Sequence, residues 1–275
     1  MSRLLSYSDN GSPVHALSGT TKLLYFLVWS LISMITYDTR LLLFMFFSSL
    51  VVFKLSRVDF KAVSFVLKLI LVFLSINLIA IFLFSPEEGV DIYGSRTVLA
   101  DLFAGYSLTA QQLFYEFNVA LKYFTIIPIA LLFILTTNPS EFASSLNKLG
   151  LSYKISYSVA ITLRYIPDMQ RDYVIVSQAQ QARGVDMSRK VSLYRRIKNT
   201  SLVLIPLFFS SMDRIDTISN AMELRGFGKK SRRTWYAAGK IQRRDRVIIV
   251  SLICFAILSI AITFADGSRF YNPFK

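Results

Sequence analysis

Long apolar runs recur along this chain, and they constrain its fold more than any other feature. Five of them stand out, at residues 23–37, 41–55, 62–84, 119–137 and 247–264. A helix needs about 20 mostly apolar residues to cross the hydrocarbon core of a bilayer, and the last three runs come close to that length or exceed it. The mean hydropathy of the whole chain, +0.48, agrees with this class. We therefore predict an all-α membrane protein with about five transmembrane helices.

The first two runs are shorter, with 15 residues each, and only Asp38-Thr39-Arg40 separates them. We predict a tight hairpin of two helices. The first of these helices extends backwards past Lys22, whose side chain snorkels to the interface. In the third run, Asn77 lies deep enough to require a polar partner on a neighbouring helix. The spans as predicted contain no acidic residue that could relay protons.

Positive charge is concentrated in one part of the chain. The net charge is +14, and residues 139–246 hold 20 Lys or Arg against 8 Asp or Glu. Positive residues near the ends of membrane helices mark the cytoplasmic side, so we place the N-terminus and this segment in the cytoplasm and the C-terminus outside. Because this bias explains the charge, we expect no nucleic-acid partner. The chain thus divides into a four-helix transmembrane region (1–138), a cytoplasmic region (139–246), and a last helix with an outer tail (247–275).

The cytoplasmic region carries the same short pattern twice. One copy ends at Gly184 and the other at Gly226. Each has an Ala five residues before the Gly, a Gln or Glu three before it, and an Arg directly before it. A glycine after the last apolar-periodic residue and an Arg in the last turn are typical of a helix C-terminus. We therefore predict that two helices end at these glycines.

Both predicted helices are amphipathic. The first begins at Pro167 and the second at Asp213, after an apolar piece at residues 201–212 that is too short to span and is interrupted by Pro206. Apolar residues at helical spacing form one face of each helix. These predicted faces consist of Met169, Tyr173 and Val176 on the first helix, and of Ile215, Ile218 and Met222 on the second.

Each predicted helix tip presents an arginine. A guanidinium is a planar fork that suits a carboxylate in a partly buried groove. One such tip is ordinary capping chemistry, but two in one membrane-tethered region favour a docking device that is used twice. The alternative is a basic membrane anchor or scaffold, which binds anionic lipid or another cytoplasmic protein through its overall charge. The predicted docking residues are Ala182, Arg183 and Gly184 at the first tip, and Leu224, Arg225 and Gly226 at the second.

The sequence offers little that could perform catalysis. It contains no phosphate-binding loop of the form G-x-x-x-x-G-K-[ST] and no His/Cys/carboxylate group with metal-ligand spacing. We expect the lone His15, beside a turn, to make a local hydrogen bond, and the single Cys254 excludes an intramolecular disulfide. An intramembrane enzyme acting on lipid would need convergent polar residues in the spans, where only Asn77 qualifies. We therefore expect no enzymatic activity and no bound metal or cofactor.

An ordered set of motifs makes the chain resemble a known family along most of its length. The motifs are, in chain order, Gly11-Ser12-Pro13-x-His15-x-Leu17 with Thr21-Lys22-Leu23-Leu24, Arg164-Tyr165-Ile166-Pro167, Ala179 with Ala182-Arg183-Gly184, Ile205-Pro206-Leu207, and Ala221-Met222-Glu223-Leu224-Arg225-Gly226-Phe227. Together they resemble the T component, the transmembrane coupling subunit, of energy-coupling factor (ECF) importers of vitamins and metals.

This resemblance implies a transducer without catalytic activity. In such importers the T component holds two cytoplasmic ABC-type ATPases, which bind the ATP, and a small membrane protein, the S component, which captures the substrate. The helices ending at Arg183 and Arg225 would then be coupling helices, each with its tip in a groove of one ATPase. Their motion would reorient the S component in the lipid bilayer. One departure is Leu224, where the family usually has Ala, which implies a different fit at the second tip.

Overall fold

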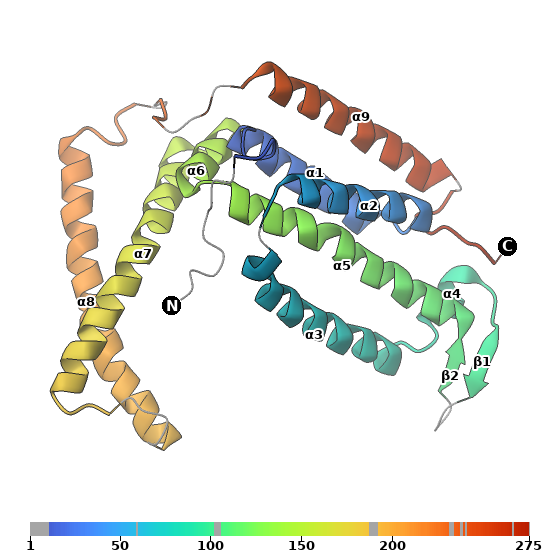
Figure 1. Cartoon of the computed structure of the whole chain (residues 1–275), viewed down its shortest axis with the longest axis horizontal. Helices are drawn as coiled ribbons and strands as arrows, with labels where there is room; N and C mark the ends of the chain where they lie inside the picture. Colours follow the sequence, from blue (N-terminus) through green and yellow to red (C-terminus); the bar gives the residue numbers. More distant parts are fainter. Residues whose placement is uncertain are drawn as a thin grey trace. The chain divides into compact units, whose positions relative to one another are not determined.

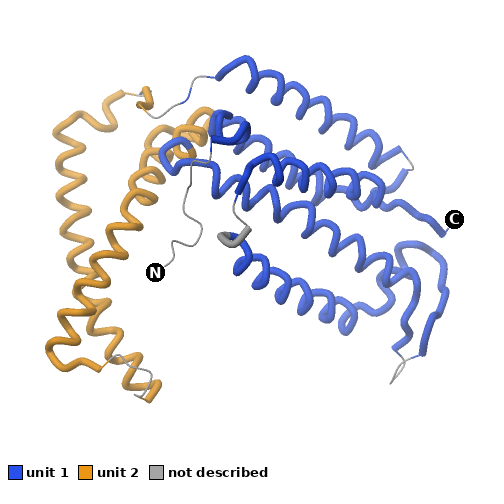
Figure 2. The backbone as a smooth tube through the Cα atoms, viewed as in Figure 1, with its two compact units in different colours: residues 1–141, 239–275 blue, residues 142–238 orange. Residues whose placement is uncertain are grey.

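The structure, a computed structural model, describes residues 11–58, 60–101, 106–186, 192–230, 234–236, 239, 241–265 and 267–274. The chain forms two compact units (Figure 2). Unit 1 comprises residues 1–141 and 239–275, and unit 2 comprises residues 142–238. Helices dominate both units, and within the described residues a pair of short strands forms the only sheet (Figure 1). The predicted all-α membrane class is therefore confirmed.

Unit 1 contains the apolar helices, arranged around α5. Its elements are α1 (Gly19–Ile35), α2 (Thr39–Leu55), α3 (Phe60–Phe84), α4 (Glu88–Tyr93), β1 (Val98–Asp101), β2 (Ser107–Thr109), α5 (Ala110–Thr136) and α9 (Arg243–Ala265). Helices α1, α2, α3 and α4 all pack against α5, and α9 packs against α1. The main buried cluster joins α1, α2 and α5 through Trp29, Ile32, Leu41, Met45, Ile129 and Leu132.

Three described helices are long and apolar enough to cross a membrane: α3 from Val63 onward, α5 and α9. Helices α1 and α2 have 17 residues each. At 1.5 Å per residue they are roughly 25 Å long, somewhat short of the ~30 Å hydrocarbon core. The prediction of a span is thus confirmed for three runs, while the total of five stays a prediction. Only residues 36–38 join α1 to α2, as a tight hairpin requires, but α2 packs mainly on α5, and α1 packs equally on α5 and α9.

At one end of unit 1, a buried carboxylate joins the first turns of α1 and α9. Asp245 Oδ1 accepts hydrogen bonds from the Ser18 backbone N–H (2.9 Å) and the Thr21 hydroxyl (2.8 Å). Its Oδ2 accepts one from the Gln242 backbone N–H (2.8 Å). Two helix N-termini, each with unpaired N–H groups and a positive dipole end, therefore share one anion. This contact holds α1 and α9 together at residues that are far apart in the sequence.

Lys22 lies at the same end of unit 1, and it is buried. Its Nζ donates to the backbone carbonyls of Thr136 (2.7 Å), at the end of α5, and of His15 (3.2 Å). The last carbonyls of a helix lack intrahelical donors, so an ammonium group is a suitable partner for them. The prediction that Lys22 snorkels to the interface is therefore wrong, because the carbonyl oxygens replace water. The predicted local bond of His15 is confirmed, since its Nδ1 lies 2.7 Å from Ser12 Oγ.

At the other end of unit 1, α4 and the β1–β2 hairpin form a folded cap on the start of α5. Gln112 Oε1 accepts from the Gly89 N–H (2.9 Å), and Gln111 Oε1 accepts from the Thr97 N–H (3.0 Å). Both glutamine side chains are fully buried. Gly89 is required here because a Cβ would lie 2.5 Å from the carbonyl carbon of Gln111. Helix α4 and the residue before β1 are thus tied to the start of α5.

Unit 2 is built mainly from two long helices, α7 (Tyr153–Ala182) and α8 (Leu193–Leu224), preceded by α6 (Pro139–Lys148), which begins in unit 1. Ser152 caps α7, since its side chain accepts from the Ile155 N–H (3.3 Å). The predicted helix starts at Pro167 and Asp213 are therefore wrong. Pro167 and Pro206 lie inside continuous helices. A proline removes one hydrogen bond, and the many remaining bonds of a helix of 30 or 32 residues outweigh that loss.

Candidate functional site

Helices α7 and α8 are antiparallel and cross near their middles (Figure 1). At the crossing, Arg214 Nη2 lies 2.8 Å from Asp172 Oδ2, and the Ser211 hydroxyl donates to Met169 Sδ (3.2 Å). Asp172 lies well inside α7, which starts 19 residues earlier. Its carboxylate forms an ion pair between the two helices.

Helix α7 ends at Ala182, and its C-cap residue, Arg183, is followed by a Schellman motif. The Val185 N–H donates to the Gln180 carbonyl (3.0 Å), and the Gly184 N–H donates to the Gln181 carbonyl (2.9 Å). Gly184 has a φ of +87°, in the left-handed region that glycine adopts without steric cost. An added Cβ would meet no atom within 4 Å. The backbone turn, and not lack of space, therefore requires glycine at this position.

Helix α8 ends at Leu224, and its C-cap residue, Arg225, is followed by the same motif. The Phe227 N–H donates to the Met222 carbonyl (2.9 Å), and the Gly226 N–H donates to the Glu223 carbonyl (2.9 Å). Gly226 again has a positive φ, +67°. The predicted C-terminal ends of both helices are thus confirmed. The repeated sequence pattern corresponds to a repeated backbone structure.

The two tips also match in their conformation and in their distance from the crossing. The φ and ψ angles are −85° and 7° at Arg183, and −83° and 12° at Arg225. Arg183 lies eleven residues beyond Asp172, and Arg225 lies eleven residues beyond Arg214, the two partners of the ion pair. At 1.5 Å per residue, each arm extends about 16 Å. Because the helices are antiparallel, the two tips lie at opposite ends of the pair.

The predicted apolar faces are only partly covered within unit 2. Tyr173 is 37% exposed and Ile215 is 59% exposed. Unit 2 therefore leaves part of these two faces uncovered near the crossing, and their role in coupling stays a prediction. The other four predicted members of the faces are half-buried: Met169, Val176, Ile218 and Met222.

An aromatic cluster braces the second tip, and sequence patterns did not predict it. The Phe227 ring lies 5.4 Å from the Tyr153 ring and 5.0 Å from the Tyr157 ring, between ring centroids. Trp235 lies 6.2 Å from Tyr157, and its Nε1–H donates to Asn147 Oδ1 (3.0 Å). These rings come from both ends of unit 2, so no local period reveals them. The one available signal was the position of Phe227 just after the glycine, where an apolar contact often accompanies this motif.

Polar side chains within the apolar helices differ from those predicted. Asn77 makes no hydrogen bond with any described residue. Asn118 of α5 is instead fully buried, and its Oδ1 accepts from the Thr39 hydroxyl (2.7 Å). Glu116 also lies within α5, where Gln112 Nε2 donates to it (3.2 Å). Glu116 lies outside the predicted run 119–137, which contains no acidic residue, because α5 begins nine residues before that run. In the part of the chain that the structure describes, no three His, Cys, Asp or Glu side chains could hold a metal ion.

A comparison with protein families identifies the family of this chain. The model of the family described as "CbiQ: Cobalt transport protein" matches residues 10–236, which include both tips and the α7–α8 pair. The chain belongs to the CbiQ family. The resemblance that the ordered motifs predicted is thereby confirmed.

Several relatives of this CbiQ-family chain carry the name "Energy-coupling factor transporter transmembrane protein EcfT". The protein of Lactococcus lactis subsp. cremoris (strain MG1363) is 35% identical over 161 residues, covering 56% of this chain and 60% of the relative. The protein of Exiguobacterium sibiricum is 32% identical over 148 residues, covering 51% of this chain and 56% of the relative. The protein of Macrococcus caseolyticus (strain JCSC5402) is 27% identical over 241 residues, covering 80% of this chain and 90% of the relative. The chain thus spans about three-fifths or less of the first two relatives and most of the third.

Proposed function

We propose that this chain is the transmembrane energy-coupling component of an ECF-type importer of vitamins or metal ions. In this role it docks two ABC-type ATPases through the tips at Arg183 and Arg225. It transmits their ATP-driven motion to an S component, the small membrane subunit that binds the substrate. The chain itself catalyses no reaction and binds no cofactor, since the partner subunits bind ATP. Its family membership and the names of its relatives support this class of role.

The observation that supports docking most strongly is the pair of matching helix ends. Two tips with the same backbone, on arms of equal length, suit two copies of one kind of groove. The Arg183 side chain is exposed and forms no ion pair with any described residue, so its guanidinium fork is available to a partner carboxylate. A helix C-terminus repels an acidic group by its dipole. The arginine at each tip offsets that repulsion.

The crossing of α7 and α8 provides a route for the motion. Each tip continues a single long helix into the crossing, so a displacement at the tip is carried there without an intervening loop. At the crossing, the partly exposed Asp172–Arg214 pair connects the two helices. Tyr173 and Ile215 leave an apolar surface beside that pair, and this surface is where we place the contact with the S component.

We place the N-terminus in the cytoplasm and the C-terminus outside the cell membrane. The start of α1, the end of α5 and the start of α9 meet around Lys22 and Asp245, and three arginines of α9 adjoin this end. The C-terminal tail lies at the opposite end of unit 1, where the Tyr37 N–H donates to the Arg269 carbonyl (2.9 Å). The positive-inside bias assigns the arginine-rich end to the cytoplasm. A reporter enzyme active only outside the cytoplasm, fused after the last residue, should therefore be active.

The function is tested by purifying the tagged full-length chain in mild detergent and identifying its partners by mass spectrometry. We expect two nucleotide-binding ATPase subunits and one small hydrophobic membrane protein. Substrate uptake by cells should fail when the chain is deleted and return when it is restored. Recovery of the chain alone, across several detergents and with added nucleotide, would contradict the proposal.

A second candidate function, a basic membrane anchor, is favoured by the start of α8. Leu193, Tyr194 and Ile197 are 77%, 82% and 68% exposed there, and the exposed basic residues Arg195 and Arg196 lie between them. Exposed apolar and basic residues on one helix are typical of helices that bind anionic membranes. This function predicts binding to anionic vesicles that falls steeply with salt. It also predicts equal losses whichever arginine is removed, whereas docking predicts that Arg183 and Arg225 dominate.

A further inference from the structure

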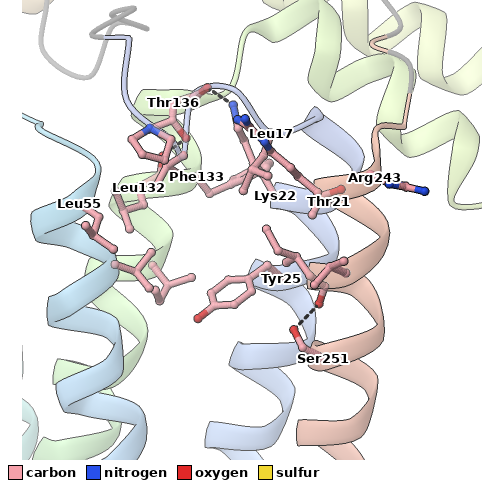
Figure 3. A pocket seen from close by; sticks show the side chains of 17 residues that line it. Leu17, Thr21, Lys22, Tyr25, Leu55, Leu132, Phe133, Thr136, Arg243 and Ser251 are labelled. Atoms are coloured by element: carbon pink, nitrogen blue, oxygen red, sulfur yellow. Dashed lines mark hydrogen bonds between the residues drawn. The ribbon is translucent and has the colours of Figure 1, made fainter.

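Unit 1 contains a cavity of about 660 Å³ that the proposed function does not use (Figure 3). It is lined by the segment before α1 and by α1, the end of α2, the end of α5 and the first turns of α9. This volume lies within the range of sites that bind small molecules. Most of its wall is apolar, including Leu17, Tyr25, Leu55, Leu132, Phe133 and Val247.

Inside the cavity, the side chains of Thr21, Lys22, Thr136 and Ser251 already have partners within the protein, whereas the Tyr25 hydroxyl makes no hydrogen bond with a described residue (Figure 3). The Lys22 ammonium donates to the Thr136 carbonyl, and the Thr21 hydroxyl donates to Asp245. The Ser251 hydroxyl donates to a carbonyl of its own helix (2.9 Å). A polar occupant would therefore lose its hydration and gain only a hydrogen bond to the Tyr25 hydroxyl, which costs free energy. The interior selects a hydrocarbon group.

One rim of the cavity is cationic. Arg243 and Arg244 both line it at the start of α9, both are exposed, and neither forms an ion pair with a described residue. Helix α9 is long and apolar enough to cross the membrane and begins at Arg243. The two guanidinium groups therefore lie at the depth where phospholipid head groups begin. Arginine binds phosphate through parallel N–H bonds, and paired arginines favour an anion.

We infer that this cavity binds one anionic phospholipid, with an acyl chain in the apolar interior and the phosphate of the head group at Arg243 and Arg244. The surrounding bilayer supplies such a ligand continuously. A zwitterionic phospholipid fills the interior equally well, but it brings an ammonium group close to the two guanidinium groups. The site therefore discriminates lipids by the net charge of the head group. This inference does not depend on the docking of ATPases.

The rim is tested by native mass spectrometry of the full-length protein with its co-purified partners. The complex is stripped of lipid and then supplied with phosphatidylglycerol or with phosphatidylcholine of the same acyl chains. We expect one retained phosphatidylglycerol, with an affinity on the order of tenfold above that for phosphatidylcholine. Arg243→Gln with Arg244→Gln should remove this preference. Arg246→Gln, a matched exposed arginine of the same turn that does not line the cavity, should leave the preference unchanged.

The interior is tested by filling the cavity. Ser251→Phe places a ring in it and should abolish retention of both lipids. The control is Val250→Phe, because Val250 lies next to Ser251 on the same helix, is 60% exposed and does not line the cavity. This variant should retain both lipids as the wild type does. Equal retention of the two lipids by the wild type, equal loss of preference in Arg246→Gln, or retention of lipid by Ser251→Phe would each overturn the inference. Lipid bound by the isolated chain but absent from the assembled complex would also overturn it, because a protein partner would then occupy the cavity.

Discussion

The two arginine-glycine tips share one backbone geometry but differ in what surrounds them. After Gly184 the chain continues with Val185 and Asp186, whose carbonyl accepts a hydrogen bond from the Asn199 side chain (2.6 Å). After Gly226, Phe227 packs against two tyrosine rings at the start of α7. The repeated sequence pattern therefore determines the backbone shape of each tip. Tertiary contacts determine how firmly each tip is held.

The tips also differ in the side chain that precedes the arginine. Ala182 offers a single methyl group at the first tip, whereas Leu224 is 90% exposed at the second. An exposed leucine gains free energy when a partner covers it. The second tip therefore combines an aromatic attachment with a larger apolar side chain, whereas the first tip, among the described residues, is held by a hydrogen bond and presents only a methyl group. We expect the two tips to respond differently to equivalent substitutions.

The largest difference in stability should come from Phe227→Ala. Truncating a fully buried Phe costs about 3–5 kcal/mol, and since Phe227 is half-buried we expect about 2–3 kcal/mol. Hydrogen exchange should accelerate at the amides that follow Gly226 and stay unchanged at those that follow Gly184. Val185→Ala, the equivalent change at the first tip, is the control and should have little effect. Equal acceleration at both tips would show that the aromatic cluster does not brace the second.

Replacing each glycine by alanine should reveal a smaller difference in stability between the two tips. A left-handed conformation costs a residue with a Cβ about 1–2 kcal/mol, and both glycines have positive φ. At the second tip Phe227 holds the turn in place, so Gly226→Ala should bear the full strain energy, and its melting temperature should fall accordingly. At the first tip the last turn can fray, so Gly184→Ala should lower it less. Equal melting temperatures for the two variants would contradict this difference.

Leu224→Ala should weaken docking at the second tip without destabilising the chain. Because Leu224 is already exposed, its removal leaves no cavity in this protein. Burying part of a leucine in a partner groove contributes about 1–2 kcal/mol, so the Kd of the ATPase for the second tip should rise on the order of tenfold. The reciprocal control, Ala182→Leu, tests whether the first groove tolerates the larger side chain. An unchanged Kd for Leu224→Ala would show that the partner does not contact this residue.

The smallest effect should come from the ion pair at the crossing, and it should affect both tips equally. Asp172 and Arg214 are 28% and 35% exposed in their side chains, so Asp172→Ala should cost only about 0.5–1 kcal/mol. Spin labels on cysteines introduced at Val185 and at the exposed Lys229, with Cys254→Ser, should then report a broader distance distribution between the tips. The exchanged pair Asp172→Arg with Arg214→Asp should restore the narrow distribution. If the distribution does not change, the pair does not fix the crossing.

Local patterns predicted those parts of the fold that depend on local physics. Both helix ends followed from glycine after arginine, and the long spans followed from apolar runs. Prolines misled the prediction of helix starts, because Pro167 and Pro206 are tolerated inside long helices. The partners of Lys22, Thr21 and Phe227 come from distant parts of the chain. No periodicity reports such contacts, so the Asp245 network, the aromatic brace and the cavity emerged only from the structure.

The most direct test of the account is the number of ATPase subunits that co-purify with charge-reversal variants in nucleotide-free buffer. Reversing a charge that pairs across a partly buried interface leaves an uncompensated carboxylate, at a cost of about 3–5 kcal/mol. We predict two ATPases for the wild type, one for Arg183→Glu or Arg225→Glu alone, and none for the double variant. Arg195→Glu with Arg196→Glu, at two exposed arginines away from both tips, should retain two. Two ATPases bound to the double variant, or an equal loss in this control, would contradict docking through the tips.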